Sequence, residues 1–196
     1  MNLVNMSQSK SIFNCPSTLD LRKRLINPTV ALLPWLTHTE LLTKKLFDKS
    51  GDTSLKILRE HNVKASWWER YVLKLDSDMV FHREILTYAY DQPCWYARSI
   101  LPHVTLQKHN ELFVRLKRET LGDLIFGNNG IVRKNMSFYH ISHENLEFHW
   151  LNRNLYLDTK VLWVRLSEFE IDSNGTFFLV EILLPGIEKY LLGVPL

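Results

Sequence analysis

The sequence predicts one α+β domain, with a central antiparallel sheet of about six strands and helices packed on one face. Its 196 residues fit a single domain, and 45% of them are hydrophobic, which is enough for a sizeable core. Segments rich in branched and aromatic residues recur along the chain and are bounded by turn signals. Strands that follow one another through short turns pair in antiparallel fashion, and the helices then cover one face of the sheet.

The domain is expected to occupy residues 29–190. Residues 1–28 have the character of a loose lead-in, and residues 191–196 form a short tail. No internal repeat at a solenoid or propeller period divides the chain further.

The first half of the domain is predicted to combine one helix with four strands. The helix covers residues 39–49, where Thr39 can cap the start and Gly51 follows the end. Leu42 and Leu46 would share its apolar stripe. Strands are predicted over residues 53–63, 67–75, 79–90 and 94–101, with a turn at Asp91-Gln92-Pro93.

The second half is predicted to begin with helices and end with strands. Residues 106–117 have helical periodicity, and residues 120–126 have the pattern of a short helix after a turn. Asn174-Gly175 favours positive φ and therefore a tight hairpin between the last two strands. Strands are predicted over residues 131–141, 161–171 and 176–184.

The charge balance does not call for a large nucleic-acid-binding surface. The net charge is +3, from 24 basic and 21 acidic residues, and the sequence pI is about 8.8. The densest basic runs are short and suit solvated faces; they are Arg22–Arg24, Lys44–Lys45 and Arg115–Arg118. Small anionic metabolites are therefore the expected partners, with no nucleic acid.

The composition indicates a soluble, cytoplasmic protein without stable membrane insertion. Residues 1–11 are polar and lack the apolar core of a signal peptide. The longest apolar stretch, residues 177–184, is interrupted by Glu181 and is too short to span a bilayer. Cys15 and Cys94 lack metal-ligand spacing and are expected to be reduced thiols.

Glu181 is the most informative residue, because it stands in an apolar strand. Alternate side chains of a strand point to opposite faces, and both faces of residues 177–184 are otherwise apolar. A buried, unpaired carboxylate costs on the order of several kcal/mol, so Glu181 needs a partner or a ligand. A core ion pair and an edge-strand glutamate that reaches water are both open as ordinary explanations.

Arg83 is the natural counterpart of this glutamate. It shares a strand face with Ile85, whereas His82 and Glu84 have the polarity of a solvent-facing surface. An inward guanidinium suits a planar carboxylate, which it can bind through two parallel hydrogen bonds. A surface arginine paired with Glu84 or another acid is the alternative. Together Arg83 and Glu181 suggest a mostly apolar cavity with one cation and one carboxyl group.

No metal or cofactor site is expected. His140, His143 and His149 lie close together in sequence but lack a further ligand at helical spacing, which favours surface histidines. The loop at residues 127–130 lacks the Lys-Ser/Thr pair of a phosphate-binding loop. Nucleophile elbows built on Ser or Cys are also missing.

Six short segments between Trp35 and Pro185 form an ordered set that includes the arginine and the glutamate singled out above. They are Trp35 with Leu41-Leu42-Thr43-Lys44-Lys45, Arg83-Glu84-Ile85-Leu86, Gln92-Pro93-Cys94-Trp95-Tyr96-Ala97-Arg98, Thr120-Leu121-Gly122-Asp123-Leu124-Ile125-Phe126, Leu162-Trp163, and Val180-Glu181-Ile182-Leu183-Leu184-Pro185. In this order and approximate spacing, the set resembles the bacterial chorismate lyases.

The resemblance implies a ligand cavity buried beneath two helical flaps. It also implies a cofactor-free lyase that converts chorismate to 4-hydroxybenzoate and pyruvate, the first committed step of ubiquinone biosynthesis. In that family an arginine at the position of Arg83 holds the ring carboxylate, and a glutamate at the position of Glu181 bonds the ring hydroxyl. Backbone amides at the positions of Leu42 and Leu121 also contact the ligand. Product inhibition and a monomeric state are expected.

The main alternative is a non-catalytic domain of the same fold that senses small aromatic acids. Such domains of transcription regulators normally follow a DNA-binding segment, for which the stretch before Trp35 offers no room. The stretch from His140 to Lys160 is longer than the family leads one to expect, and it could reshape a flap edge or an oligomer surface.

Overall fold

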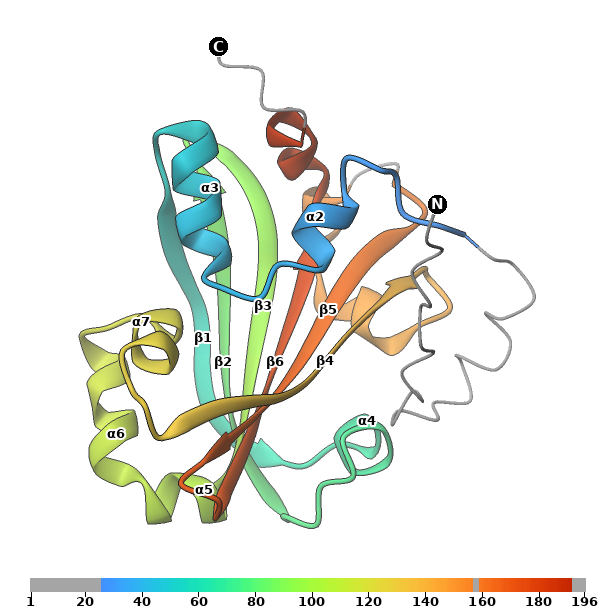
Figure 1. Ribbon diagram of the computed structural model, residues 1–196. Coiled ribbons are helices and arrows are strands. Elements are labelled where there is room, and N and C mark those ends of the chain that lie inside the picture. Colours follow the sequence, from blue (N-terminus) through green and yellow to red (C-terminus); the bar gives the residue numbers. More distant parts are fainter. Residues whose placement is uncertain (1–25, 157–158, 192–196) are drawn as a thin grey trace, which may run out of the picture.

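The computed structural model of the protein describes residues 26–156 and 159–191 (Figure 1). Most of the expected lead-in and most of the tail fall outside this part of the chain. The predictions for Cys15 and for the basic run Arg22–Arg24 also lie outside the described residues.

A six-stranded antiparallel sheet confirms the predicted α+β class. The strand order is β1-β2-β3-β6-β5-β4, so two groups of three strands meet where β3 pairs with β6. Within each group, one connection is long and the other is a tight turn. The strands are β1 Ser54–Lys64, β2 Met79–Ala89, β3 Gln92–Pro102, β4 Ile131–Ile141, β5 Leu162–Ile171 and β6 Gly175–Leu183.

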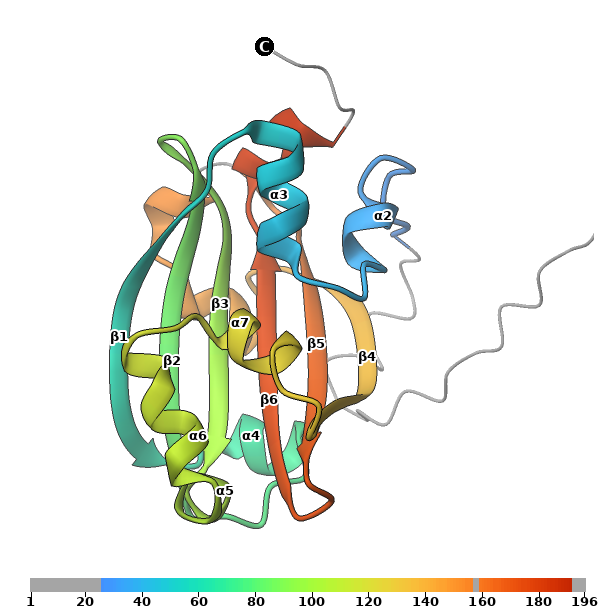
Figure 2. The same cartoon turned by 60° about the vertical axis from the view of Figure 1, so that its left-hand side comes forward.

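Short helices from two parts of the chain cover the face of the sheet that carries Arg83 and Glu181 (Figure 2). They are α2 Leu33–Leu36, α3 Leu42–Ser50, α5 His103–Lys108, α6 Asn110–Val114, the 3₁₀ turn η1 Arg115–Lys117, and α7 Leu121–Phe126, with η4 Pro185–Tyr190 beside α3. No helix in the described ranges has the length and apolar character needed to cross a membrane.

These helices agree with the prediction at the end of α3 and differ from it in two places, the start of α3 and a break at His109. α3 ends at Gly51, which has the left-handed φ of 78° typical of a helix C-cap. Its start is Leu42, with no side-chain cap, so the prediction that Thr39 caps it is wrong. The helix predicted over residues 106–117 is broken at His109, whose ring lies in hydrogen-bond contact with the β5–β6 hairpin.

The opposite face of the sheet is also covered. Its cover consists of α4 Trp67–Val72 and the 3₁₀ turns η2 Leu146–Trp150 and η3 Arg153–Leu155. Trp68 on α4 and Trp150 on η2 pack edge to face, with ring centroids 5.0 Å apart. The long connection between β4 and β5 therefore completes a second core beneath the sheet.

The strand predicted over residues 67–75 is wrong, because the chain forms α4 there. Ser66 accepts a hydrogen bond from the backbone of Glu69, and the Glu69 side chain accepts one from the backbone of Ser66. This capping box starts a helix, and it outweighs the strand preference of the branched and aromatic residues that follow.

Burial on both faces changes the interpretation of the residues beside Arg83. His82 and Glu84 are only 6% and 8% exposed. The prediction that they face solvent is wrong, since α4 and the β4–β5 connection cover their side of the sheet.

The predicted hairpin between β5 and β6 is present, but its backbone differs from the expected one. Positive φ occurs at Asp172 and Ser173, at 46° and 58°, rather than at Asn174-Gly175. Gly175 is needed for a different reason: a Cβ there would lie 2.8 Å from Nε2 of His109.

Candidate active site

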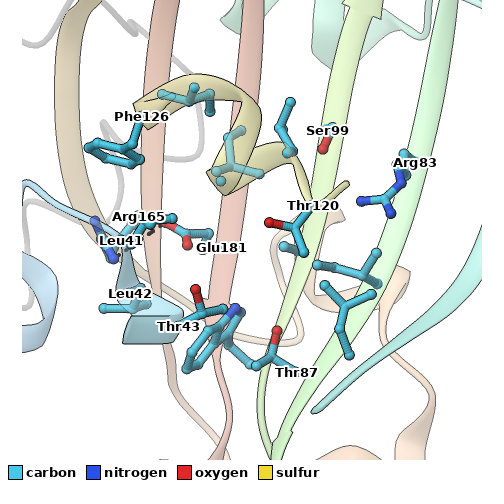
Figure 3. A pocket seen from close by; sticks show the side chains of 18 of the residues that line it. Leu41, Leu42, Thr43, Arg83, Thr87, Ser99, Thr120, Phe126, Arg165 and Glu181 are labelled. Carbon is cyan, nitrogen blue, oxygen red and sulfur yellow. Dashed lines mark ion pairs between the residues drawn. The ribbon is translucent and has the colours of Figure 1, made fainter. Parts of the chain in front are cut away.

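A cavity lies on the sheet beneath α3 and α7, between two apolar clusters (Figure 3). One cluster includes Trp35, Leu42 and Trp95. The other includes Leu121 and Phe169. The cavity volume is about 70 Å³. Since one water molecule needs roughly 10–15 Å³ by this measure, the space suits a small compound.

The cavity has a charged group at each side and a floor of small side chains. Arg83 lies at one side, and Arg165 with Glu181 at the other (Figure 3). β3 runs between β2 and β6, so these two strands lie two strand spacings apart, roughly 9–10 Å, and Arg83 stands opposite Ser99 of β3 while Glu181 stands opposite Ala97. Ala97 and Ser99 of β3 line the space between them. The arrangement suits a flat ligand with different polar groups at its two ends.

The charged side chains that line the cavity in the described part of the chain carry an excess of positive charge, which Glu60 partly offsets through its ion pair with Arg83. Three arginines stand against two glutamates: Arg83, Arg133, Arg165, Glu40 and Glu181. Opposite charge attracts and orients a small ligand most strongly in a poorly hydrated cleft. The cavity therefore favours an anion, and the expectation of one cation and one carboxyl group was an undercount.

Arg83 is held by β1 and is available to a ligand. Its side chain is buried, and Nε donates to Oε1 of Glu60 at 2.8 Å. Within the described ranges Glu60 is the one polar partner of Arg83, and it occupies only Nε. The two terminal nitrogens remain for a carboxylate. The alternative, a surface arginine paired with Glu84 or another acid, is right about an acidic partner, which is Glu60, but Arg83 is buried and Glu84 pairs with Arg98.

Glu181 has an ion-pair partner that is not Arg83. Nη1 of Arg165 lies 3.4 Å from Oε2 of Glu181, and the two residues stand directly opposite each other on β5 and β6. Arg165 is 1% exposed, and its other terminal nitrogen donates to the carbonyl of His38 at 2.6 Å. One carboxylate oxygen of Glu181 is thus close to a compensating charge, while the residue still lines the cavity.

Sequence reasoning missed Arg165 and Arg133. Arg165 carries the signal that identifies Glu181, a charge on an apolar strand. Arg133 stands beside a β-bulge, which disrupts the alternation that would assign it to a face. Its guanidinium lies 5.1 Å from the ring centroid of Phe169, and burial lowers the pKa of Arg133. In the described part of the chain, Nε of each arginine is buried without a hydrogen-bond partner.

The two flaps over the cavity are the starts of α3 and α7. Leu42 and Leu121 are the first residues of these helices, so their N–H groups have no partner inside the helix. The flaps meet each other, because a Cβ on Gly122 would lie only 2.3 Å from the side chain of Leu41. Thr120 caps α7, whereas α3 has no side-chain cap.

The three histidines weighed as metal ligands do not gather into one group in the described ranges. His140 is half-buried beside Trp163, with ring centroids 5.7 Å apart. His143 and His149 are exposed, and Nε2 of His149 lies 2.8 Å from the carbonyl of His143.

The amino-acid sequence matches one protein family over most of its length. The family model for chorismate lyase matches residues 19–189. A probable chorismate pyruvate-lyase of Pseudoalteromonas translucida is 28% identical over 156 residues, which cover 80% of this chain and 85% of the relative. Another, from Azoarcus sp. strain BH72, is 29% identical over 173 residues, with 84% and 87% covered.

Among solved structures, PhnF from Mycobacterium smegmatis has a similar fold. The TM-score is 0.51 at 14% identity, over 76% of this chain and 65% of that chain. At this identity the likeness concerns the fold alone. It agrees with the α+β arrangement described above.

Proposed function

Since the chain belongs to the chorismate lyase family, we propose that it is a chorismate pyruvate-lyase, which converts chorismate to 4-hydroxybenzoate and pyruvate. The placement of Arg83 and Glu181 at opposite sides of a small, positively charged cavity carries this proposal. Chorismate is a small dianion whose ring carboxylate and ring hydroxyl lie at opposite ends. The reaction would be the first committed step of ubiquinone biosynthesis.

Arg83 would anchor the ring carboxylate. Glu60 fixes the guanidinium through Nε and leaves the two terminal nitrogens for two parallel hydrogen bonds. The amides of Leu42 and Leu121, at the starts of the flaps, would add donors from above.

Glu181 would accept a hydrogen bond from the ring hydroxyl at the other end of the ligand. Arg165 compensates the charge of this glutamate from the neighbouring strand. Arg133 also lines the cavity, and its buried Nε has no hydrogen-bond partner among the described residues. It would meet the second carboxylate, on the enolpyruvyl group.

The proposed reaction breaks the bond between the ring and the ether oxygen of the enolpyruvyl group. The ring loses the proton on the carbon that bears the hydroxyl and becomes aromatic. The released enolpyruvate takes up a proton and becomes pyruvate. Because aromatisation supplies a large driving force, the main tasks of the enzyme are orientation and charge placement, and we propose that it performs them without a cofactor.

The test is to incubate the chelator-treated full chain with chorismate and to follow pyruvate and 4-hydroxybenzoate in separate assays. Equal amounts of both products are expected. Arg83→Ala should lower kcat/KM by roughly two orders of magnitude, because it removes a charge-assisted anchor in a buried site. Arg59→Ala is the matched control, since Arg59 is exposed on β1.

Two outcomes would count against the proposal. Wild-type protein that binds 4-hydroxybenzoate tightly but releases no pyruvate would favour the sensing domain instead. Equal activity of the Arg83→Ala and Arg59→Ala variants would remove Arg83 from the substrate site.

A further inference from the structure

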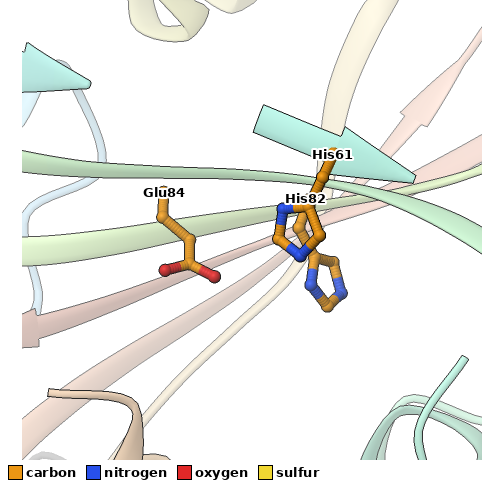
Figure 4. A group of neighbouring side chains, drawn as sticks. All are labelled: His61, His82 and Glu84. Atoms are coloured by element: carbon orange, nitrogen blue, oxygen red, sulfur yellow. The ribbon is translucent and has the colours of Figure 1, made fainter. Parts of the chain in front are cut away.

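A second polar cluster lies on the face of the sheet opposite the cavity (Figure 4). His61 on β1 stands directly across from His82 on β2, and Glu84 follows two residues later on the same face of β2. One possible ligand atom from each of the three side chains lies within 4.8 Å of the other two. Two imidazoles and a carboxylate thus converge from adjacent, hydrogen-bonded strands.

Each imidazole of this cluster can offer one ring nitrogen to a metal ion. Nε2 of His82 is in contact with the carboxylate of Glu69 on α4, a partner that fixes the ring and leaves Nδ1 as the other nitrogen. Histidine ligands of metals usually have such a carboxylate on the nitrogen that does not bind the metal. Nδ1 of His61 is buried and lacks a hydrogen-bond partner in the described part of the chain.

The charged groups around the cluster balance one another. The carboxylates of Glu69 and Glu84 stand against two guanidinium groups, those of Arg98 and of Arg59, which lies opposite Glu84 in the β1–β2 register. Arg98 donates to Oε1 of Glu84 at 3.1 Å and lies 3.8 Å above the ring of Trp150, and the Tyr96 hydroxyl is a further hydrogen-bond partner of Glu84.

From this geometry we propose that His61, His82 and Glu84 bind one divalent transition-metal ion. Two imidazoles and one carboxylate are a common zinc ligand set, with metal–ligand bonds of roughly 2.0–2.2 Å. The three ligand atoms, which lie within 4.8 Å of one another, would have to move closer together to bind one ion at such distances. Because Glu69 lies behind His82, the site would also have an outer partner in place.

The proposed metal site and Arg83 lie on opposite faces of the same two strands, β1 and β2. Glu60 pairs with Arg83 across β1 and β2, and the next pair in the register is His61 with His82. Glu60 and Arg83 point to the cavity face, while the metal ligands point to the other. A bound ion would therefore hold together the same two strand segments that position Arg83.

The test is calorimetric titration of the chelator-treated full chain with ZnCl₂, and a parallel titration with Co²⁺ followed by visible absorption. One ion per chain is expected, with a Co²⁺ spectrum typical of nitrogen and oxygen ligands. His61→Gln and His82→Gln should each weaken binding at least tenfold. The exposed His143 supplies the control variant, His143→Gln, which should bind as the wild type does.

His61→Gln decides the question if His82→Gln does not fold, because His61 is only half-buried on an edge strand. Wild-type protein without stoichiometric binding, or binding unchanged in a folded His61→Gln variant, would overturn the proposal. Chorismate is not used in any of these measurements, so their outcome is separate from that of the lyase assay.

Discussion

Glu181 and Arg165 are two buried charges that compensate each other across β5 and β6. Removing one partner of a buried ion pair leaves the other charged and desolvated, which costs roughly 3–5 kcal/mol. We expect Arg165→Met and Glu181→Gln each to lower the free energy of unfolding by about 3 kcal/mol. The double variant should lose clearly less than the sum. Urea denaturation of the four proteins measures this coupling, and strictly additive losses would contradict it.

Glu147 is a buried acid outside the cavity, and it predicts a pH effect on stability. Burial raises the pKa of its carboxyl group, so the folded protein keeps this proton to a higher pH than the unfolded chain does. The stabilising contribution of such a group is complete below its unfolded pKa and is lost as the pH rises through the folded pKa. Glu147→Gln should therefore melt at a higher temperature than the wild type at neutral pH.

Thermal denaturation across the acid and neutral range tests this prediction. The variant keeps an oxygen for the hydroxyl of Tyr139, which now donates to Oε1 of Glu147 at 3.1 Å. The two melting curves should converge in acid, where both side chains are neutral. A difference that is the same at every pH would assign the effect to packing rather than to the proton.

Single strand patterns identify inward charges but not their partners. Arg83 and Glu181 can be found because each interrupts an apolar strand face. The pairing of Glu181 with Arg165 depends on the register between two strands, which neither strand reveals alone. His82 and Glu84 are wrongly assigned to solvent for a related reason: alternation separates the two faces of a strand but does not say what covers each.

Two short helices start with the same device on opposite faces of the sheet. Thr120 caps α7 over the cavity, and Ser66 caps α4 on the other side, each in a capping box. Removing either hydroxyl should lower the free energy of unfolding by about 1 kcal/mol. Only Thr120→Ala should also weaken binding of 4-hydroxybenzoate, by several-fold, because α7 forms a flap.

Chemical denaturation and ligand titration of Thr120→Ala and Ser66→Ala measure the two effects. Thr120→Ser serves as the rescue variant, since it keeps the hydroxyl that accepts the backbone hydrogen bond of Asp123. Equal ligand affinity in all three variants would show that the start of α7 takes no part in binding.

Capping signals also explain how far the elements could be predicted. The pattern from Thr120 correctly predicts α7, and Gly51 correctly predicts the end of α3. The residues of the capping box, Ser66 and Glu69, are visible in the sequence. The branched and aromatic residues that follow them are typical of a strand, and they lead to the wrong prediction. The start of α3 could not be predicted from the local sequence, because Leu41 precedes it and no side chain of the capping type stands there.

At the scale of the whole molecule, the candidate site spans the junction between the two groups of three strands, where β3 pairs with β6. Arg83 belongs to the first group, and Glu181 and Arg165 to the second. The product 4-hydroxybenzoate keeps both the carboxylate and the hydroxyl of the proposed substrate, so it would bind between the groups. We expect it to inhibit initial rates and to stabilise the fold, by about 2.7 kcal/mol at one hundred times its Kd.

Initial rates and melting temperatures with added ligand measure both effects. Benzoate, which lacks the hydroxyl, should inhibit and stabilise less than 4-hydroxybenzoate. Progress curves that do not respond to added 4-hydroxybenzoate would refute the shared site.

The pairing of β3 with β6 has a consequence for how the chain folds while it is being synthesised. Trp95 pairs with Leu183 and Ile100 with Phe178. β3 is synthesised well before β6, so this pairing can form only after the last strand of the sheet has been made. As the chain leaves the ribosome, β1, β2 and β3 can already pair with one another, while the other edge of β3 has no strand beside it. Such an apolar edge invites pairing with other chains. Chaperone capture of the nascent protein is therefore expected to end only when β6 emerges.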